Sequence, residues 1–128
     1  MEAINDNNNK YTKAKIYKIV DNGYNLTYFG STTKQLSTRM VRHIRMHRLH
    51  SDGKYHNVSV FKIFDEFGTE NCRIELVENF SCNTKTELLK REGFYISNKE
   101  CVNRYVAGRT QIRNIVMKIK KQSENIKL

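Results

Sequence analysis

Two short runs near the start of the chain, at 15–20 and 25–30, are rich in β-branched and aromatic residues, with polar residues among them. Runs of this composition are typical of β-strands. Between the runs lies Asn22-Gly23. This residue pair is the strongest local signal for a two-residue hairpin turn, because both central positions of that turn take positive φ. The pattern therefore predicts an antiparallel hairpin centred on Asn22 and Gly23.

Counting outward from this turn places Tyr17 directly opposite Tyr28. The two phenols would project from one face of the sheet, with Cβ atoms roughly 4.5–5.5 Å apart. Two interpretations stay open on these residues alone. The pair is either a cross-strand aromatic contact that only stabilises the hairpin, or a pair of proton carriers or phosphate ligands.

Helical periodicity begins after the hairpin. A first helix is predicted over 34–50, with Thr32 and Gln35 at capping-box spacing and an apolar stripe of Leu36, Met40 and Ile44, which Val41 could extend. The remaining predicted elements are a helix near 57–67, a strand at 72–80, a helix from Asn83 or Thr84 to Asn98, and a short strand or ordered connection at 101–106.

The resulting order, β-β-α-α-β-α, predicts a small α/β domain in which helices pack on a short mixed or antiparallel sheet. A chain of 128 residues is long enough for one such domain. We expect a flexible polar lead-in at 1–12, the folded domain at 13–106 and a basic, helical tail at 107–128.

The charge of the chain indicates a polyanionic partner. Twenty-three Lys and Arg residues against thirteen Asp and Glu give a net charge of +10. Such an excess favours binding to a nucleic-acid backbone through the release of counterions. The three cysteines lack Cys-x-x-Cys spacing, and no membrane span or secretory signal is evident. We therefore expect an intracellular protein, cytoplasmic or nuclear, with no membrane partner.

The first predicted helix carries candidate chemistry. Arg39 and His43 are four residues apart and share one face, at the rim between the apolar stripe and solvent. Arginine offers a fixed set of donors to phosphate, and histidine can move a proton near neutral pH. His43, His47 and His50 also share a side, but zinc is disfavoured because a fourth ligand is lacking and neighbouring arginines would repel a cation. Arg39 as a surface residue remains an alternative.

Glu92 is the second unusual residue. The apolar residues around it place it in the middle of the buried side of its helix. An ionised carboxylate is costly there unless a cation compensates it. It is either an ion-pair partner of a distant basic residue or a ligand for a hard cation such as Mg²⁺, which typically takes one or two carboxylates.

Five of these side chains match the requirements of phosphodiester hydrolysis, which are a proton acceptor, a cation for the developing charge and a metal ligand. They are Tyr17, Tyr28, Arg39, His43 and Glu92. The run Lys15-Ile16-Tyr17, then Tyr28-Phe29-Gly30, then Arg39-x-x-x-His43, then Glu92, then Asn103 resembles the GIY-YIG nuclease superfamily. It is similar to the short stand-alone members of large DNA viruses and phages. The departures are Lys15 for the first glycine and Phe29 for isoleucine, and neither removes a side chain that the chemistry uses.

The resemblance implies a central three-stranded antiparallel sheet flanked by helices, with 13–106 as the catalytic domain. It implies Tyr17 as general base, Tyr28 as orienting group, His43 as proton carrier and Arg39 as charge stabiliser. Glu92 would bind a single Mg²⁺ or Mn²⁺, and Asn103 would steady the site near Glu92. We expect Arg39 and the metal to lower the pKa of Tyr17 from about 10, which is too high for a base at neutral pH.

The resulting prediction is a metal-dependent DNA endonuclease that cuts one strand per active site, as a monomer or a transient dimer on DNA. We expect weak sequence specificity or a preference for DNA structure. A non-catalytic nucleic-acid-binding module on the same scaffold and an RNA endonuclease remain alternatives. The residues expected to contact the nucleic-acid backbone are Lys15, Lys34, Arg42, Arg45, Arg109 and Arg113.

Overall fold

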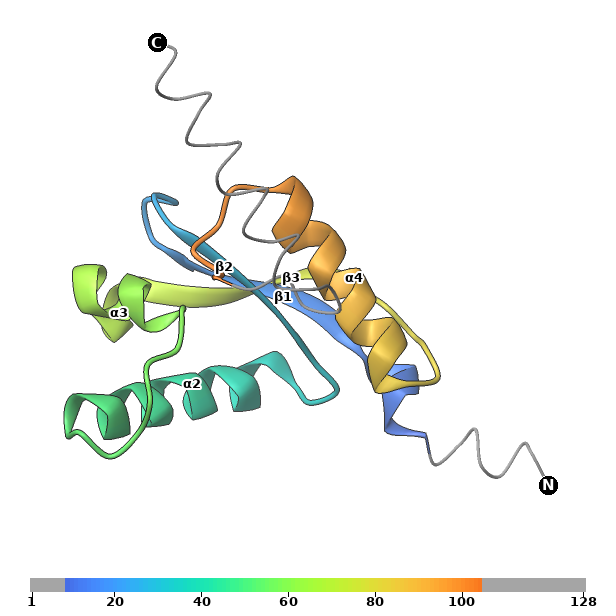
Figure 1. Cartoon of the computed structure of the whole chain (residues 1–128), viewed down its shortest axis with the longest axis horizontal. Helices are drawn as coiled ribbons and strands as arrows, with labels where there is room; N and C mark the ends of the chain where they lie inside the picture. Colours follow the sequence, from blue (N-terminus) through green and yellow to red (C-terminus); the bar gives the residue numbers. More distant parts are fainter. Residues whose placement is uncertain (1–8, 105–128) are drawn as a thin grey trace, which may run out of the picture.

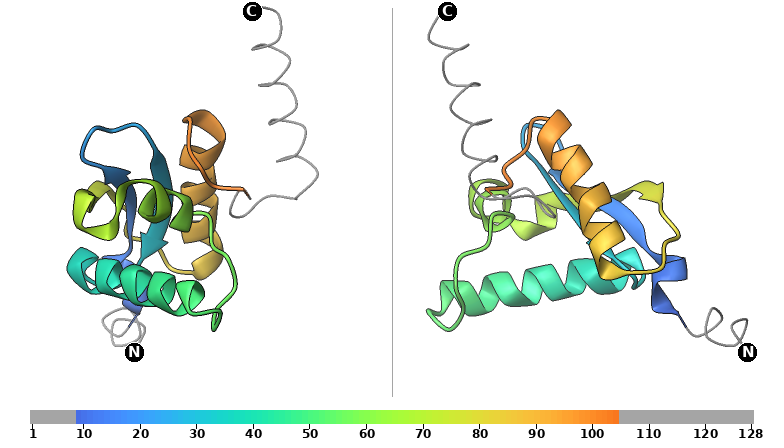
Figure 2. Two further views of the ribbon diagram at one scale, coloured as in Figure 1. Left: turned by 90° about the vertical axis from the view of Figure 1, so that its left-hand side faces the viewer. Right: turned by 45° about the vertical axis from the view of Figure 1, so that its right-hand side comes forward.

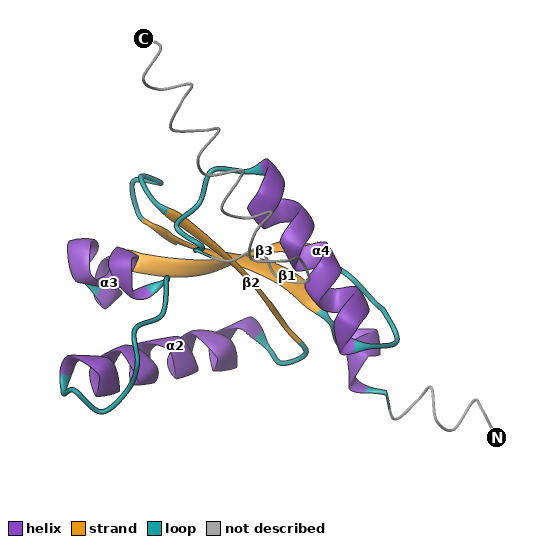
Figure 3. Ribbon diagram, viewed as in Figure 1, coloured by secondary structure: helices purple, strands orange, loops and turns teal. Residues whose placement is uncertain are grey.

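A computed structural model describes residues 9–104 as one three-stranded antiparallel sheet with helices on both of its faces (Figures 1 and 3). The strand order is β2-β1-β3, so β1 is central. The elements are the short 3₁₀ helix η1 (Lys10–Lys13), β1 (Lys15–Asp21), β2 (Thr27–Thr32), α2 (Leu36–Ser51), α3 (Phe61–Phe67), η2 (Thr69–Asn71), β3 (Cys72–Asn79) and α4 (Lys85–Asn98). This confirms the predicted fold class and element order. Residues 1–8 of the predicted lead-in and the tail at 107–128 lie outside the described residues, whereas residues 10–12 of the lead-in belong to η1.

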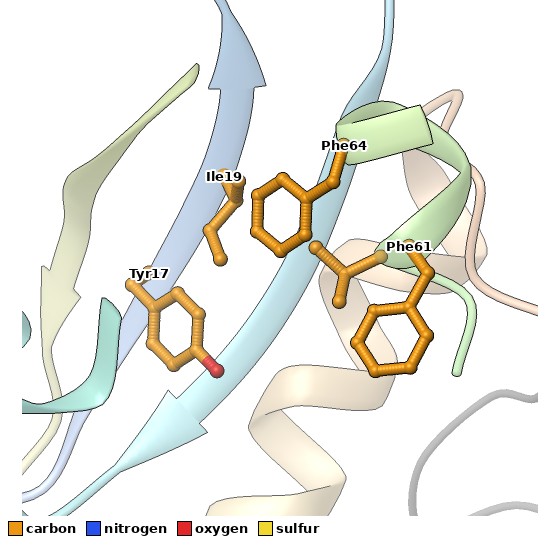
Figure 4. Packing of buried hydrophobic residues seen from close by; sticks show 5 residues of the cluster. Tyr17, Ile19, Phe61 and Phe64 are labelled. Carbon is orange, nitrogen blue, oxygen red and sulfur yellow. The ribbon is translucent and has the colours of Figure 1, made fainter. Parts of the chain in front are cut away.

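The two faces of the sheet hold separate apolar clusters. Tyr17 and Ile19 of β1 pack against Phe61 and Phe64 of α3 (Figure 4), and residues of α2 complete this layer. On the opposite face, Ile16 and Phe29 pack beneath α4. Figures 1 and 2 show the sheet between α2 and α3 on one side and α4 on the other. Each face of the sheet is thus covered by its own layer of helices.

The β1–β2 hairpin differs from the predicted two-residue turn. Tyr17 pairs with Gly30, and Ile19 pairs with Tyr28, so the register is shifted by two residues. The physical reason is the buried carboxylate of Asp21, which accepts hydrogen bonds from the backbone N–H groups of three loop residues. These are Gly23, Asn25 and Leu26. Because side chains alternate with a period of two, this shift leaves Tyr17 and Tyr28 on the same face.

Helix α2 begins later than predicted, and part of its predicted apolar stripe packs against the core. Gln35 is its N-cap residue but makes no side-chain capping bond, and the Thr32 hydroxyl instead accepts from the Lys34 N–H. The capping box expected here was therefore wrong. Val41 is 65% exposed, whereas His43 is buried. A polar side chain thus occupies an inward position on this helix.

The second and third predicted helices have contrasting outcomes. Helix α3 covers Phe61–Phe67 only, because residues 57–58 are irregular and residues 59–60 form a turn that leads into it. Helix α4 starts as predicted, since the Thr84 hydroxyl accepts from the Glu87 N–H and the Glu87 carboxylate accepts from the Asn83 N–H. Every helix within 9–104 is too short or too polar to cross a bilayer.

Candidate active site

The site is built around the hydroxyl of Tyr17. Its oxygen accepts a hydrogen bond from Nε of Arg39 at 3.1 Å and lies 2.6 Å from Nε2 of His43. Burial, and then the charges of Arg39 and Arg42, lower the pKa of His43 to about 3. The imidazole is therefore neutral at physiological pH, so its Nε2 accepts the Tyr17 proton. Tyr17 thus receives one hydrogen bond from a cation and donates one to a neutral base.

Gly30 provides the space that this arrangement needs. It lies opposite Tyr17 in the sheet, and the Tyr17 ring extends across it. A Cβ atom at position 30 would lie 2.4 Å from both Cζ and the hydroxyl oxygen of Tyr17. Real Cβ atoms essentially never approach so closely. A residue without a side chain is therefore required where the phenol crosses β2.

Tyr28 lies beside the same histidine. Its ring meets the His43 ring edge-on, with centroids 5.7 Å apart and planes at 78°. The Tyr17 ring approaches His43 in the same manner, at 5.8 Å and 63°. The two tyrosines predicted to share a face therefore do so, with His43 between them rather than in direct cross-strand register.

Burial dominates the acidity of both phenols. It raises the pKa of Tyr17 to about 12, although the charge and hydrogen bond of Arg39 act in the opposite direction. Burial also raises the pKa of Tyr28, with further increases from Tyr17 and Glu92. The expected lowering of the Tyr17 pKa was therefore wrong for the protein alone, because desolvation of the phenolate outweighs the attraction of the guanidinium.

Glu92 reaches the site from α4, on the other layer of the sheet. Its Oε1 atom accepts a hydrogen bond of 2.5 Å from the Ser31 hydroxyl of β2. Burial raises the pKa of Glu92, while Ser31 and the charge of Arg39 oppose that shift. Glu92 thus lies at the edge strand β2, where the two helical layers meet.

One cavity of about 380 Å³ connects these groups. The residues of the site that line it are Tyr17, Tyr28, Gly30, Ser31, Arg39 and Glu92. His43 does not line this cavity but is hydrogen-bonded to the Tyr17 hydroxyl. The structure therefore brings together the phenols, the guanidinium and the carboxylate that the sequence singled out.

The surroundings of Glu92 fit a hard divalent cation. The carboxylate is largely buried and receives a hydroxyl bond from Ser31, and Arg39 acts on it only through longer-range charge. Burial is what raises its pKa, and it outweighs both the Ser31 hydrogen bond and the charge of Arg39. Within 9–104 no three His, Cys, Asp or Glu residues cluster as metal ligands. One carboxylate suits Mg²⁺, which keeps several waters and binds substrate phosphates.

Comparison with solved structures shows the same fold in a nuclease domain. The catalytic domain of intron endonuclease I-TevI, in a point-mutant form, matches 77% of this chain and 97% of its own length. The TM-score is 0.52 and the sequence identity is 22%. The fold is GIY-YIG-like. No protein-family model and no curated protein matches the chain.

In this GIY-YIG-like fold, Asn103 holds β2 in place. Its side-chain oxygen accepts from the Phe29 N–H at 3.0 Å, and its Nδ2 atom donates to the Phe29 carbonyl at 2.8 Å. Phe29 lies between Tyr28 and Gly30, both of which line the cavity. Asn103 therefore contacts the strand that carries these two cavity residues.

Sequence reasoning did not identify Ser31 as the partner of Glu92. Thr32 was interpreted as a helix-capping residue, and Ser31 was given no role in the site. The position of Ser31 on the strand that carries Tyr28, four residues before the N-cap Gln35, is the signal that could have indicated this role. Gly30 was likewise noted as part of a motif but not as the residue that accommodates the Tyr17 ring.

Basic side chains border a second groove, next to the site. This groove of about 550 Å³ shares Ser31 and Arg39 with the first cavity. Its basic residues are Lys34, Arg39, Arg42 and Arg45. Lys15 is used differently, because its ammonium group donates to the carbonyls of Lys13 and Lys34. Arg109 and Arg113 lie outside the described residues.

The other two histidines of α2 have partners of their own. His47 Nε2 lies 2.7 Å from the Asp65 carboxylate. His50 Nδ1 donates to the Tyr55 carbonyl at 3.0 Å. These two side chains therefore connect α2 to α3 and to the segment between them.

Proposed function

We propose that this protein is a divalent-metal-dependent DNA endonuclease that hydrolyses one phosphodiester bond per visit. The observation that carries the proposal is the convergence of Tyr17, Arg39 and Glu92 on one cavity, although they come from three different elements. The GIY-YIG-like fold is shared with the catalytic domain of an intron endonuclease. The basic groove beside the cavity provides a path for the DNA backbone.

Tyr17 and His43 supply the proton transfer in this proposal. The Tyr17 oxygen takes a proton from the attacking water, while the proton of Tyr17 passes to Nε2 of His43 along their 2.6 Å hydrogen bond. Because His43 is neutral in the resting protein, it has room for this proton. After the bond has broken, the imidazolium returns this proton to the Tyr17 oxygen as Tyr17 releases to solvent the proton that it took from the water, and the leaving 3′-oxygen takes a proton from solvent.

Arg39 and Glu92 supply the electrostatic part. Nε of Arg39 stabilises negative charge on the Tyr17 oxygen, and the remaining N–H groups of the guanidinium are available to the phosphate. Tyr28, in the same cavity, orients the phosphate or the water. Glu92 holds a single Mg²⁺ or Mn²⁺, which when bound polarises the phosphate and stabilises the leaving 3′-oxygen.

One site per chain means that one strand is cut in each event. A double-strand break requires a second encounter or a transient dimer on DNA. With one compact basic surface at the site, we propose weak sequence specificity or a preference for DNA structure.

The proposal is tested by incubating the purified protein with supercoiled plasmid, branched DNA and RNA, in Mg²⁺, in Mn²⁺ and in EDTA. We expect metal-dependent nicking of DNA that EDTA abolishes. Tyr17→Phe should lower the rate by about 10²- to 10⁴-fold, the usual effect of losing a general base. Tyr24→Phe is the matched control, because Tyr24 is an exposed tyrosine on the β1–β2 loop.

Each alternative has its own outcome in this experiment. Salt-dependent binding of DNA without cleavage in any metal would favour a non-catalytic binding module. Faster cleavage of RNA than of DNA would favour an RNA endonuclease. Equal nicking by Tyr17→Phe and the parent would remove Tyr17 from the mechanism.

A further inference from the structure

Besides the site cavity and the basic groove, a smaller cavity adjoins the site at Tyr28 and Arg39. Its volume is about 160 Å³. The residues that line it are Tyr28, Arg39, Arg42, His43, Met46, Tyr55, Val58 and Phe61. Tyr28 and Arg39 also line the cavity that contains Glu92. The two cavities therefore share a wall, and we call the smaller one the aromatic cavity.

The walls of the aromatic cavity are ring systems, with guanidinium groups among them. Tyr28, His43, Tyr55 and Phe61 contribute four rings, and no carboxylate is among the lining residues. Arg42 is exposed at the surface of α2, and Arg39 is half-buried. This combination suits a flat, uncharged ring attached to a negatively charged backbone, and it disfavours a cation.

Tyr55, which lines the aromatic cavity, is held in place although it lies in the segment that connects α2 to α3. The Tyr55 carbonyl accepts a hydrogen bond from His50 Nδ1 at 3.0 Å, and the Lys54 N–H donates to the Leu49 carbonyl at 2.8 Å. The His50 ring in turn stacks on Phe61, with centroids 5.1 Å apart. The last turn of α2 and the first residue of α3 therefore both fix this segment, so the cavity is preformed.

We infer that the aromatic cavity binds one unpaired nucleobase beside the phosphate that is cut. One water occupies about 30 Å³, so the cavity accommodates a group several times larger. Proteins that take single bases from nucleic acids stack them against aromatic side chains. Because Tyr28 and Arg39 line both cavities, one nucleotide can place its phosphate in the first and its base in the second.

The consequence is a substrate preference, which rests on the proposed nuclease function. A base within an intact duplex is stacked and paired, and extruding it costs a few kcal/mol. DNA that already has an unpaired nucleotide at the cut, such as a bulge or a branch, avoids this cost. The protein should therefore cut such DNA faster than fully paired DNA.

The test uses the full chain and two DNA duplexes that carry 2-aminopurine, a fluorescent base, either fully paired or as a single-nucleotide bulge. We expect binding to change the fluorescence of the bulged base and to leave that of the paired base unchanged. The binding measurement uses Glu92→Gln so that the DNA stays intact. Nicking rates of the two duplexes are measured separately with Glu92 present.

Tyr55→Leu removes one ring of the cavity while keeping an apolar side chain. It should reduce the preference for the bulged duplex by about 10-fold, within the range for loss of one base–aromatic stacking contact, by slowing nicking of the bulged duplex more than that of the paired duplex. Val58→Phe, which fills the cavity, should have the same effect. Phe94→Leu is the matched control, because Phe94 is an exposed ring on α4. Melting temperatures verify that all variants fold.

The outcomes separate this inference from the nuclease proposal. Nicking of both duplexes at equal rates, with no change in 2-aminopurine fluorescence, overturns the inference and leaves the proposed function intact. A fluorescence change that Tyr55→Leu abolishes, in a protein that cuts no DNA, supports the cavity and refutes the nuclease. An equal effect of Phe94→Leu and Tyr55→Leu also overturns the inference.

Discussion

Tyr17 and Gly30 show how one residue pair determines the position of the reacting group. The Tyr17 hydroxyl reaches Arg39, His43 and the cavity only because position 30 has no side chain. The motif resemblance pointed to both residues, but only the close approach of the ring explains why the second must be glycine. The pKa of Tyr17 also depends on this packing, and so it could not be predicted from neighbours in the sequence.

Gly30→Ala should therefore impair stability and activity together. The added Cβ displaces the Tyr17 ring, which we expect to cost about 1–3 kcal/mol of unfolding free energy and to slow nicking by about 100-fold. Gly53→Ala is the control, because no atom lies within 4 Å of its added Cβ and only its positive φ is strained. It should lower the melting temperature slightly and leave the nicking rate unchanged. A fully active Gly30→Ala protein would contradict the role of Gly30.

His43 predicts a dependence of stability on pH. Its pKa is about 3 in the folded protein, against about 6.5 in the unfolded chain. Between these values the unfolded chain binds a proton that the folded protein does not, so stability falls as the pH is lowered through this window. Asp21, with a folded pKa of about 2, titrates below most of the window because hydrogen bonds from Leu26 and Asn25 outweigh the effect of burial.

His43→Gln should flatten this dependence while its amide oxygen still accepts from Tyr17. Urea unfolding from about pH 7 to about pH 4 measures the slope, and we expect the parent to lose a few kcal/mol more than the variant. Identical slopes for the two proteins would mean that His43 is protonated in the fold. The nicking rate of the parent should also show no step near pH 6.5, because His43 does not change its protonation there.

Strand β2 is the element on which the site depends most. It carries Tyr28, Gly30 and Ser31, and within residues 9–104 it forms an edge of the sheet with β1 as its one strand partner. Asn103 hydrogen-bonds to both backbone groups of Phe29. These bonds resemble those that a neighbouring strand would make. The strand itself was evident from its aromatic and β-branched residues beside the Asn-Gly pair, but its register was not, because the buried carboxylate of Asp21 favours a longer loop than this pair indicates.

Asn103→Ala should loosen β2 specifically. Loss of two buried hydrogen bonds to Phe29 should cost about 1–3 kcal/mol and speed hydrogen exchange at the Phe29 amide. Asn98→Ala is the matched control, because its side chain donates to the Phe94 carbonyl at an exposed position. Unchanged hydrogen exchange at the Phe29 amide in Asn103→Ala would show that the position of β2 does not depend on these two hydrogen bonds.

At the scale of the element, helices with strong local signals were the most predictable. The capping box at Thr84 and Glu87 places the start of α4 correctly, because both partners are local in sequence. The start of α2 was predicted less well, since the Thr32 hydroxyl bonds a loop amide instead of a helical one. The inward position of His43 depends on Tyr17, which is distant in sequence, and periodicity alone could not reveal it.

Over the whole molecule, positive charge is arranged beside the site. The chain carries a net charge of +10, and the groove next to the cavity is lined by Lys34, Arg42 and Arg45. Composition predicted a polyanionic partner but not this location. The location follows from the way the end of β2 leads into α2. Convergence of residues from both faces of the sheet is likewise a property of the complete fold.

Arg45→Ala should weaken DNA binding in a salt-dependent manner. Loss of one phosphate contact should reduce the slope of log K against log salt concentration by about 0.9. Lys62→Ala is the control, because Lys62 is an exposed cation on α3 that does not line this groove. If both variants changed the slope equally, net charge rather than the groove would account for binding.

The most direct test of the account is the nicking of supercoiled plasmid in Mg²⁺ by Glu92→Gln and Glu87→Gln, both on α4. Glu92 lies in the cavity, whereas Glu87 is an exposed capping residue. We expect Glu87→Gln to nick like the parent, and Glu92→Gln to fold normally but lose at least about 100-fold in rate. Equal nicking by Glu92→Gln and the parent would contradict a site assembled around this carboxylate.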